Sequence, residues 1–305
     1  MNTQIIKTDA LLLFTAIIWG FAFVAQRLGM DHVGPFTFNG IRFALGVLVL
    51  IPFVVRNNML SSNSDKKKHH LANRNLFTGG VFAGLALFAG ASFQQVGLVY
   101  TTAGNAGFIT GLYVVIVPML GLIFKQRTNS GTWLGALVAA CGLYFLCITD
   151  KFTIAHGDFL ELAGAIFWAT QILIIGWLSP RMDPIKLAAV QYVTCSILSL
   201  VTAFLFEEIT MIGIYRAALP ILYGGVLSVG VAYTLQVVAQ RNAHPAHAAI
   251  LLSLEAVFAV LGGWLVLGEI LTHRGLLGCG LMLTGMLMSQ LWGMLYKSDT
   301  GPTTV

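Results

Sequence analysis

Long apolar runs separated by short polar connections recur along the whole chain. Each run holds about 20 residues, enough to cross the ~30 Å hydrocarbon core of a bilayer as a helix. The runs lack the alternation of apolar and polar positions that a membrane β-strand requires. We therefore predict an all-α polytopic membrane protein with ten spans, at residues 8–28, 36–55, 76–99, 103–124, 131–149, 158–178, 185–206, 217–239, 246–267 and 273–295.

Residues at the breaks between runs carry helix-start signals. Pro35 and Pro184 suit first turns, and Asp183 precedes the second of them as an N-cap. Asp158 and Glu161 have the spacing of a capping box at the start of the sixth span.

Composition agrees with this pattern. The chain is 57% hydrophobic and 10% charged, and its mean hydropathy is +0.83. Soluble domains average about 25% charged residues, so a soluble protein with one anchor is excluded.

Lysine and arginine are distributed unequally between the two sides that ten spans create. Twelve fall on the side of the N-terminus and five on the other side. By the positive-inside rule, both termini and the loop 56–75 are cytoplasmic, in the inner (plasma) membrane. The net charge of +5 therefore reports topology, and no nucleic-acid partner is expected.

The sequence also repeats itself. "AIIWGFAF" around Trp19 matches "AIFWATQI" around Trp168, 149 residues later, and Pro35 and Pro184 keep that offset. Gln95 and Gln236 match at an offset of 141. We predict two five-span repeats, at 1–149 and 157–296, followed by a cytoplasmic tail at 297–305. Because five is odd, the second copy is inverted, an arrangement typical of secondary transporters with a midplane site.

These segments resemble a known family. The stretches "WGFAF", "PFTFNGIRF" and "TTAGNAGFITGLYVVIVPMLG" in the first copy, and "AAILLSLEAVFAVLGGWLVLGEILTHRGLLG" in the second, are similar to EamA-type units of the drug/metabolite transporter superfamily. The resemblance covers nearly the whole chain. It implies a ten-span secondary transporter, often an exporter of amino acids or related metabolites, that works without ATP hydrolysis.

Two positions depart from the family pattern. Ala256 stands where the family often has a proline, which leaves no proline to distort the helix beside Glu255. Gln126 stands where the first copy often has the glutamate that the second copy keeps as Glu269. Glu269 itself is expected to be a solvated residue at a helix end.

Glu255 is an acid inside an apolar span. It stands about 13 Å into span 246–267, near the bilayer midplane. Acids at such depth usually serve a function, and burial favours the neutral carboxyl, which lets the group exchange a proton. We expect proton coupling or binding of a substrate ammonium. The alternative is a structural hydrogen bond to a neighbouring helix.

Other polar or amphipathic residues stand at depth. Arg42 is expected to snorkel to the outer interface, with anion binding or ion pairing as the alternative. Trp19 and Trp168 are expected to face the interior of the bundle, where core packing competes with substrate contact. Gln95 and Gln236 are interpreted as cavity residues in preference to staples between helices.

These observations predict a secondary active transporter, with or without proton coupling, that exports a small polar or amphipathic metabolite such as an amino acid by alternating access. Its substrate site would be bordered by Trp19, Gln95, Tyr113, Trp168, Gln236 and Glu255. No catalytic residue, cofactor or metal ligand is predicted. A passive channel would show a ring of charges or carbonyls, which is not evident. An intramembrane enzyme would show a motif such as G-x-S-x-G or H-E-x-x-H, and the sequence has neither.

Overall fold

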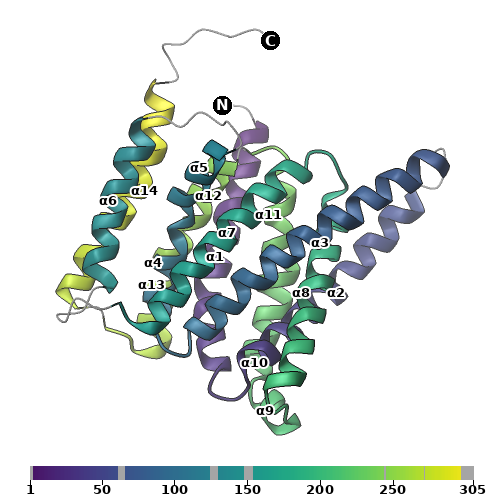
Figure 1. Ribbon diagram of the computed structural model, residues 1–305, viewed down its shortest axis with the longest axis horizontal. Helices are drawn as coiled ribbons and strands as arrows, with labels where there is room; N and C mark the ends of the chain where they lie inside the picture. Colours follow the sequence, from purple (N-terminus) through teal and green to yellow (C-terminus); the bar gives the residue numbers. More distant parts are fainter. Residues whose placement is uncertain are drawn as a thin grey trace.

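The protein is a bundle of helices (Figure 1). The computed structural model describes residues 3–60, 66–123, 130–147, 154–243, 245–270 and 272–296, and every element in these ranges is helical. The elements are α1 (Thr3–Gly29), α2 (Pro35–Leu60), α3 (Lys66–Gly97), α4 (Ala103–Gly111), α5 (Tyr113–Ile123), α6 (Ser130–Cys147), α7 (His156–Leu178), α8 (Pro184–Phe206), α9 (Met211–Arg216), α10 (Ala218–Leu222), η1 (Tyr223–Tyr233), α11 (Thr234–Ala239), α12 (Pro245–Ser253), α13 (Glu255–Gly262), η2 (Gly263–Leu267) and α14 (His273–Tyr296).

Eight helical stretches are long and apolar enough to cross a membrane. They correspond to eight of the ten predicted spans. The other two predicted spans fall on α6 and α14, which do not meet the same length and hydropathy criteria within the described residues. Ten spans therefore stays a prediction for these two helices.

Helix pairing places the two halves of the chain against each other. Helix α2 packs on α8, α3 packs on α7 and α8, and η1 packs on α1 and α2. Helices α6 and α14 stand side by side at one edge of the bundle. Helix α1 begins and α14 ends on the same side of the bundle (Figure 1).

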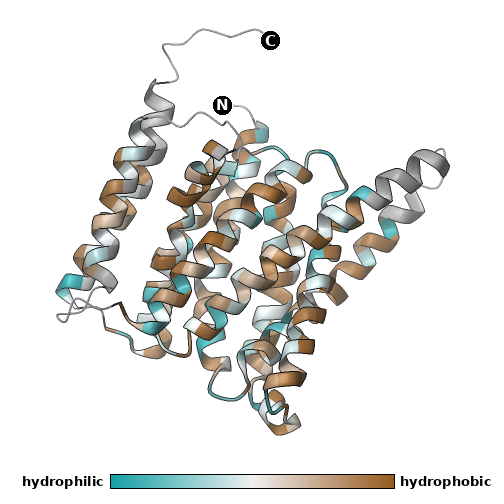
Figure 2. Cartoon of the chain, viewed as in Figure 1, coloured by the Kyte–Doolittle hydropathy of each residue, from teal (hydrophilic) through white to brown (hydrophobic). Residues whose placement is uncertain are grey.

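The outer surface of the bundle is apolar, unlike that of a soluble protein. Large apolar residues such as Phe204, Leu205 and Leu137 are exposed. Hydrophobic residues cover the helices along most of their length (Figure 2). The interior is also largely apolar, but it holds amides and charged residues as well, among them Gln26, Gln94, Gln95, Gln171, Gln191, Gln236, Arg42, Glu161 and Glu255. Polar groups turn inward because hydrocarbon offers them no hydrogen-bond partners.

Helix α8 begins as predicted, whereas the capping box predicted for α7 is wrong. Asp183 accepts hydrogen bonds from the amides of Ile185 and Lys186, at 3.0 and 3.2 Å. Helix α7 instead begins at His156, before both predicted capping residues. Asp158 accepts a hydrogen bond from Thr101 at 2.6 Å, and Glu161 is fully buried beside Thr110. Both carboxyl groups therefore join α7 to the segment around α4.

Carboxylates from the second half cap helices of the first half. Glu207 accepts hydrogen bonds from the amides of Phe36 and Thr37 at the start of α2, both at 2.8 Å. Glu269 accepts from the amides of Ala103 and Gly104 at the start of α4. The prediction of a merely solvated Glu269 was wrong, because the free amides and positive end of α4 lie within its reach.

Helices α6 and α14 approach each other at glycines. A Cβ atom on Gly142 would lie 2.6 Å from the carbonyl oxygen of Gly278, and one on Gly285 would lie 2.5 Å from that of Gly135. Gly135 and Gly278 are 143 residues apart, as are Gly142 and Gly285. The contact is therefore reciprocal between residues that the sequence repeat pairs.

Candidate functional site

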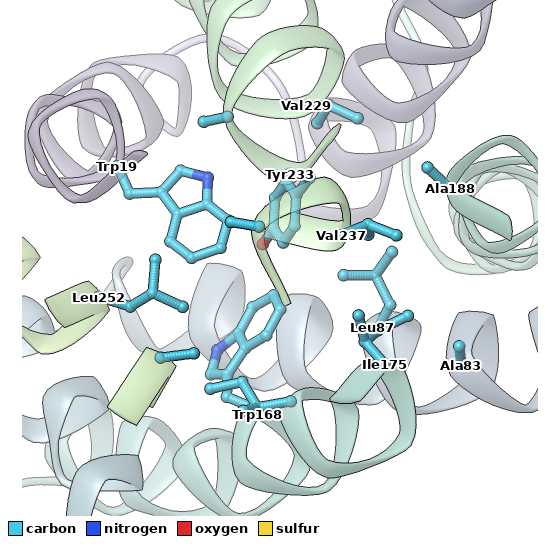
Figure 3. Close-up of a cluster of buried hydrophobic side chains, with 14 of the residues drawn as sticks. Trp19, Ala83, Leu87, Trp168, Ile175, Ala188, Val229, Tyr233, Val237 and Leu252 are labelled. Carbon is cyan, nitrogen blue, oxygen red and sulfur yellow. The ribbon is translucent and has the colours of Figure 1, made fainter. Parts of the chain in front are cut away.

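Three aromatic rings meet at the centre of the bundle (Figure 3). Trp19 of α1 and Trp168 of α7 lie on either side of Tyr233, at the end of η1, with ring centroids 4.4 and 5.9 Å from its ring. Both indoles are more than nine-tenths buried. The Trp19 indole N–H donates to the Ser228 carbonyl oxygen at 3.3 Å. The mid-span tryptophans thus face the interior, as the sequence predicted.

Glu255 lies at an interruption in its span, where α12 ends and α13 begins. Leu254 separates the two helices, and the amide of Val257 bonds back to its carbonyl in a tight three-residue turn. The interruption exists although Ala256 is not a proline. The span of Tyr113 is interrupted in the same way at Leu112, six residues before Pro118.

Tyr113 and Glu255 are hydrogen-bonded to each other. The Tyr113 hydroxyl donates to Oε1 of Glu255 at 2.9 Å, and both side chains are buried. An acid deep in the bundle is thereby held by a neutral donor. In the described part of the chain, the ion pairs are Arg27 with Asp31 and Asp9 with His247, so no cation pairs with Glu255 there.

Arg42 does not snorkel to the interface, contrary to the sequence-based expectation. It is 1% exposed, and its guanidinium carbon lies 5.6 and 5.1 Å from the ring centroids of Phe38 and Phe43. The stacked rings, and the absence of a side chain on Gly224 beside the Arg42 stem, keep the guanidinium inside the bundle.

These groups share one cavity. Five of the six predicted site residues line it, namely Trp19, Tyr113, Trp168, Gln236 and Glu255, and Arg42 lines it as well. Its volume of about 30 Å³ leaves room for about two water molecules. A metabolite therefore needs the surrounding helices to separate before it can enter.

Gln95 is not among the residues that line the cavity, although its neighbour Gln94 is. Gln95 is fully buried and its amide donates to the Gln26 carbonyl at 3.4 Å. Adjacent residues of a helix point about 100° apart, so the rotation of α3 about its axis decides whether Gln94 or Gln95 lines the cavity. The structure therefore gives Gln95 the stapling role that the sequence left as the alternative.

The second half has a corresponding amide network. Gln236 donates to Gln171 at 3.1 Å, and Gln171 donates to Gln191 at 3.3 Å. Gln171 and Gln236 also line the cavity. These amides therefore join helices and border the cavity at once.

Several cavity residues were missed or left without a role by sequence reasoning. Among them are Gln26, Thr110, Ser228 and Tyr233. Thr110 donates to Glu161 at 3.2 Å and so links that buried acid to the cavity wall. Small polar residues on apolar helices give no sequence signal of the side on which they lie. Tyr233, by contrast, falls within the predicted span of Gln236 and was expected to point inward, but it was not assigned to the site.

Some buried polar atoms of the residues that line the cavity have no hydrogen-bond partner within the described ranges. They are Nε and Nη2 of Arg42, the indole nitrogen of Trp168 and Oε1 of Gln236. Buried donors and acceptors are normally satisfied, and an unsatisfied one costs about 1–3 kcal/mol. Three donors and one acceptor thus stand ready for a polar ligand.

Comparison with known proteins identifies the family. A model of the EamA-like transporter family matches residues 6–148 and 155–291. An "Uncharacterized transporter" of Archaeoglobus fulgidus is 35% identical over 93% of this chain and 85% of its own length. The "Uncharacterized transporter YoaV" of Bacillus subtilis is 24% identical, over 90% and 93%. The "Uncharacterized inner membrane transporter YedA" of Escherichia coli K12 is 23% identical, over 92% and 90%.

A solved structure shares the fold. A protein crystal structure with 18% sequence identity superposes with a TM-score of 0.71 and covers 96% of this chain and 99% of its own. At this identity the likeness concerns the fold alone. The family match over both halves, together with the archaeal relative and the eight membrane-spanning helices, shows that the chain is an integral membrane protein of the EamA-like transporter family.

Proposed function

We propose that the protein is a secondary transporter that exports a small polar or amphipathic metabolite, such as an amino acid, by alternating access and with proton coupling. One observation carries the proposal: one buried cavity is lined by an acid, a cation, four amides and five aromatic side chains. Such a cavity, apolar in its walls with a few placed polar groups, is typical of a small-molecule site.

Two inverted copies, residues 1–149 and 157–296, would provide the alternating movement. Reciprocal contacts support this arrangement, because Gly142 touches Gly278 where Gly285 touches Gly135. Self-complementary contact of this kind is the mark of a two-fold axis. In this scheme α6 and α14 complete ten spans, and the site lies between the copies.

Glu255 is the proposed coupling group. It lines the cavity, is 3% exposed and has a hydrogen-bond donor, Tyr113, that serves the carboxyl group when it is ionised. Proton uptake and substrate binding would then alternate at one place. The lysine and arginine distribution supports cytoplasmic termini, and the name of YedA as an inner membrane transporter supports the inner membrane.

Reconstitution tests this function. Purified protein in liposomes is supplied with radiolabelled amino acids, with and without an imposed pH gradient. We expect counterflow of at least one amino acid and a gradient-dependent rate. Glu255→Gln should abolish the gradient dependence, whereas Glu208→Gln, at an exposed position, should not. Conductance far above carrier rates would show a channel, and absence of counterflow across the panel would refute amino acid transport.

A further inference from the structure

We propose that Arg42 and the indole of Trp168 form a subsite for a carboxylate, so that the transported class is amino acids or related carboxylates and not amines. This inference rests on the proposed transport function and narrows its substrate. It assigns a ligand group to the two cavity residues whose donors have no partner among the residues that the structure describes.

Arg42 is a buried cation without a counter-ion. It is 1% exposed, makes no ion pair with any described residue, and leaves Nε and Nη2 without acceptors. The faces of Phe38 and Phe43 stabilise its charge in part, but a ring face does not occupy N–H groups that lie in the guanidinium plane. Removing such a charge from water is costly unless a partner arrives.

A planar guanidinium can donate two parallel hydrogen bonds to the two oxygens of a carboxylate. Trp168 adds a third unpartnered donor on the same cavity, and an indole nitrogen can only donate. Three vacant donors and a positive charge favour an anionic acceptor. A carboxylate supplies two acceptor oxygens and one negative charge. A multivalent anion would need more than one cation, and Arg42 is the only cation among the described residues that line the cavity.

Glu255 does not fill this role. Its Oε1 already accepts from Tyr113, and no ion pair joins it to Arg42. Arg42 and Glu255 line the same cavity, together with Tyr233, and do not pair with each other. An acid and a base kept apart in one cavity complement the two ends of a zwitterion, with the ammonium toward Glu255 and the carboxylate toward Arg42.

The sequence repeat supplies a natural neutral substitute. Gln191 occupies the position equivalent to Arg42, 149 residues later, and is buried like it. Arg42→Gln therefore removes the charge while it keeps a long polar side chain of a kind that the bundle already buries. Arg42→Lys keeps the charge and removes the planar fork.

The test measures competition in proteoliposomes. A labelled amino acid that shows counterflow competes with its own unlabelled form, its decarboxylated amine and its carboxamide; for phenylalanine these are phenethylamine and phenylalaninamide. For the wild-type protein, we expect the amine and the amide to compete at least about tenfold more weakly, the loss typical of an unpaired polar group. Arg42→Gln should weaken competition by the amino acid about tenfold and change that of the amine less than twofold.

Trp168→Phe keeps an aromatic ring but removes the indole N–H donor. Like Arg42→Gln, it should therefore weaken competition by the amino acid. Arg27→Gln is the matched control, because Arg27 is partly exposed and pairs with Asp31 outside the cavity. The competition measured with the wild-type protein tests the carboxylate subsite even if a variant does not fold. Equal competition by amine, amide and amino acid would overturn the carboxylate subsite and leave transport intact. Absence of any counterflow would instead remove the transport function on which the subsite rests.

Discussion

The hydroxyl of Tyr113 lies 2.9 Å from a carboxyl oxygen of Glu255, and the two residues are 142 positions apart. That spacing falls between the offsets of 141 and 143 that relate the later spans of the two copies. Each residue also directly follows a helix interruption, at Leu112 and Leu254. In a two-fold arrangement, contacts between matching segments of the two copies lie near the axis. We infer that this bond sits where the two proposed halves meet and would move.

The two partners of this bond are predicted to differ in their effects. Glu255→Gln keeps an oxygen that can accept from Tyr113 but cannot take up a proton, so folding should change little while the response of transport to a pH gradient is lost. Tyr113→Phe removes the donor and leaves a buried acceptor, which should lower the free energy of unfolding by about 1–3 kcal/mol. Thermal unfolding in detergent and gradient-driven counterflow measure the two effects separately. Normal gradient dependence in Glu255→Gln would contradict the coupling role.

Glycines on α14 give a second prediction with an internal control. A Cβ on Gly285 would lie 2.5 Å from the Gly135 carbonyl oxygen, whereas one on Gly280 would meet nothing within 4 Å. Gly285→Ala should therefore force α6 and α14 apart and cost about 1–3 kcal/mol. Gly280→Ala should be neutral or stabilising by up to about 1 kcal/mol, because alanine favours the helix. Equal melting temperatures for the two variants would show that the close contact is absent.

Much of the fold follows from local composition, whereas the cavity depends on rotation and long-range packing. An apolar run of about 20 residues has few structures open to it besides a membrane helix, so eight spans were predicted within a few residues. The mid-span aromatic residues and Glu255 were found because such groups are rarely left facing lipid. The hydropathy pattern does not show how a helix is rotated about its axis. For that reason Gln95 was predicted to line the cavity, whereas Gln94 does so.

Arg42 illustrates a second limit of sequence-based prediction, which is that contacts between distant segments cannot be read from a local pattern. Arg42 lies inside an apolar span, but its side chain is long enough either to reach the interface or to stay inside. The rings of Phe38 and Phe43 and the bare backbone of Gly224, which lies about 180 residues away in the chain, decide the outcome. Likewise, Glu269 caps α4 only because the fold brings the end of η2 beside Ala103. Contacts between distant segments leave no local pattern in the sequence.

Helix capping by Glu207 yields a third prediction. This carboxylate accepts from the amides of Phe36 and Thr37 and from the Thr37 hydroxyl, so it ties the end of α8 to the start of α2. Glu207→Ala should lower the free energy of unfolding by about 1–2 kcal/mol, through the lost cap and the lost interaction with the helix dipole. Glu208→Ala at the exposed neighbouring position should change it by less than about 0.5 kcal/mol. If both variants melt alike, the carboxylate does not act as a cap.

The proposed inversion requires that the first copy cross the membrane an odd number of times. A tag at the N-terminus and a tag directly after residue 150 should then be labelled from opposite sides of the membrane, because α6 completes a fifth crossing. A tag at the C-terminus does not discriminate, since eight spans and ten spans both return the chain to its starting side. A tag within residues 61–65, between α2 and α3, is the control, because it lies on the side of the N-terminus under either count, and retained counterflow would show that the tags leave the protein folded. Labelling of the N-terminal tag and the residue-150 tag from the same side would mean that α6 does not cross, and the reciprocal glycine contact with α14 would then join two helices outside the spanning bundle.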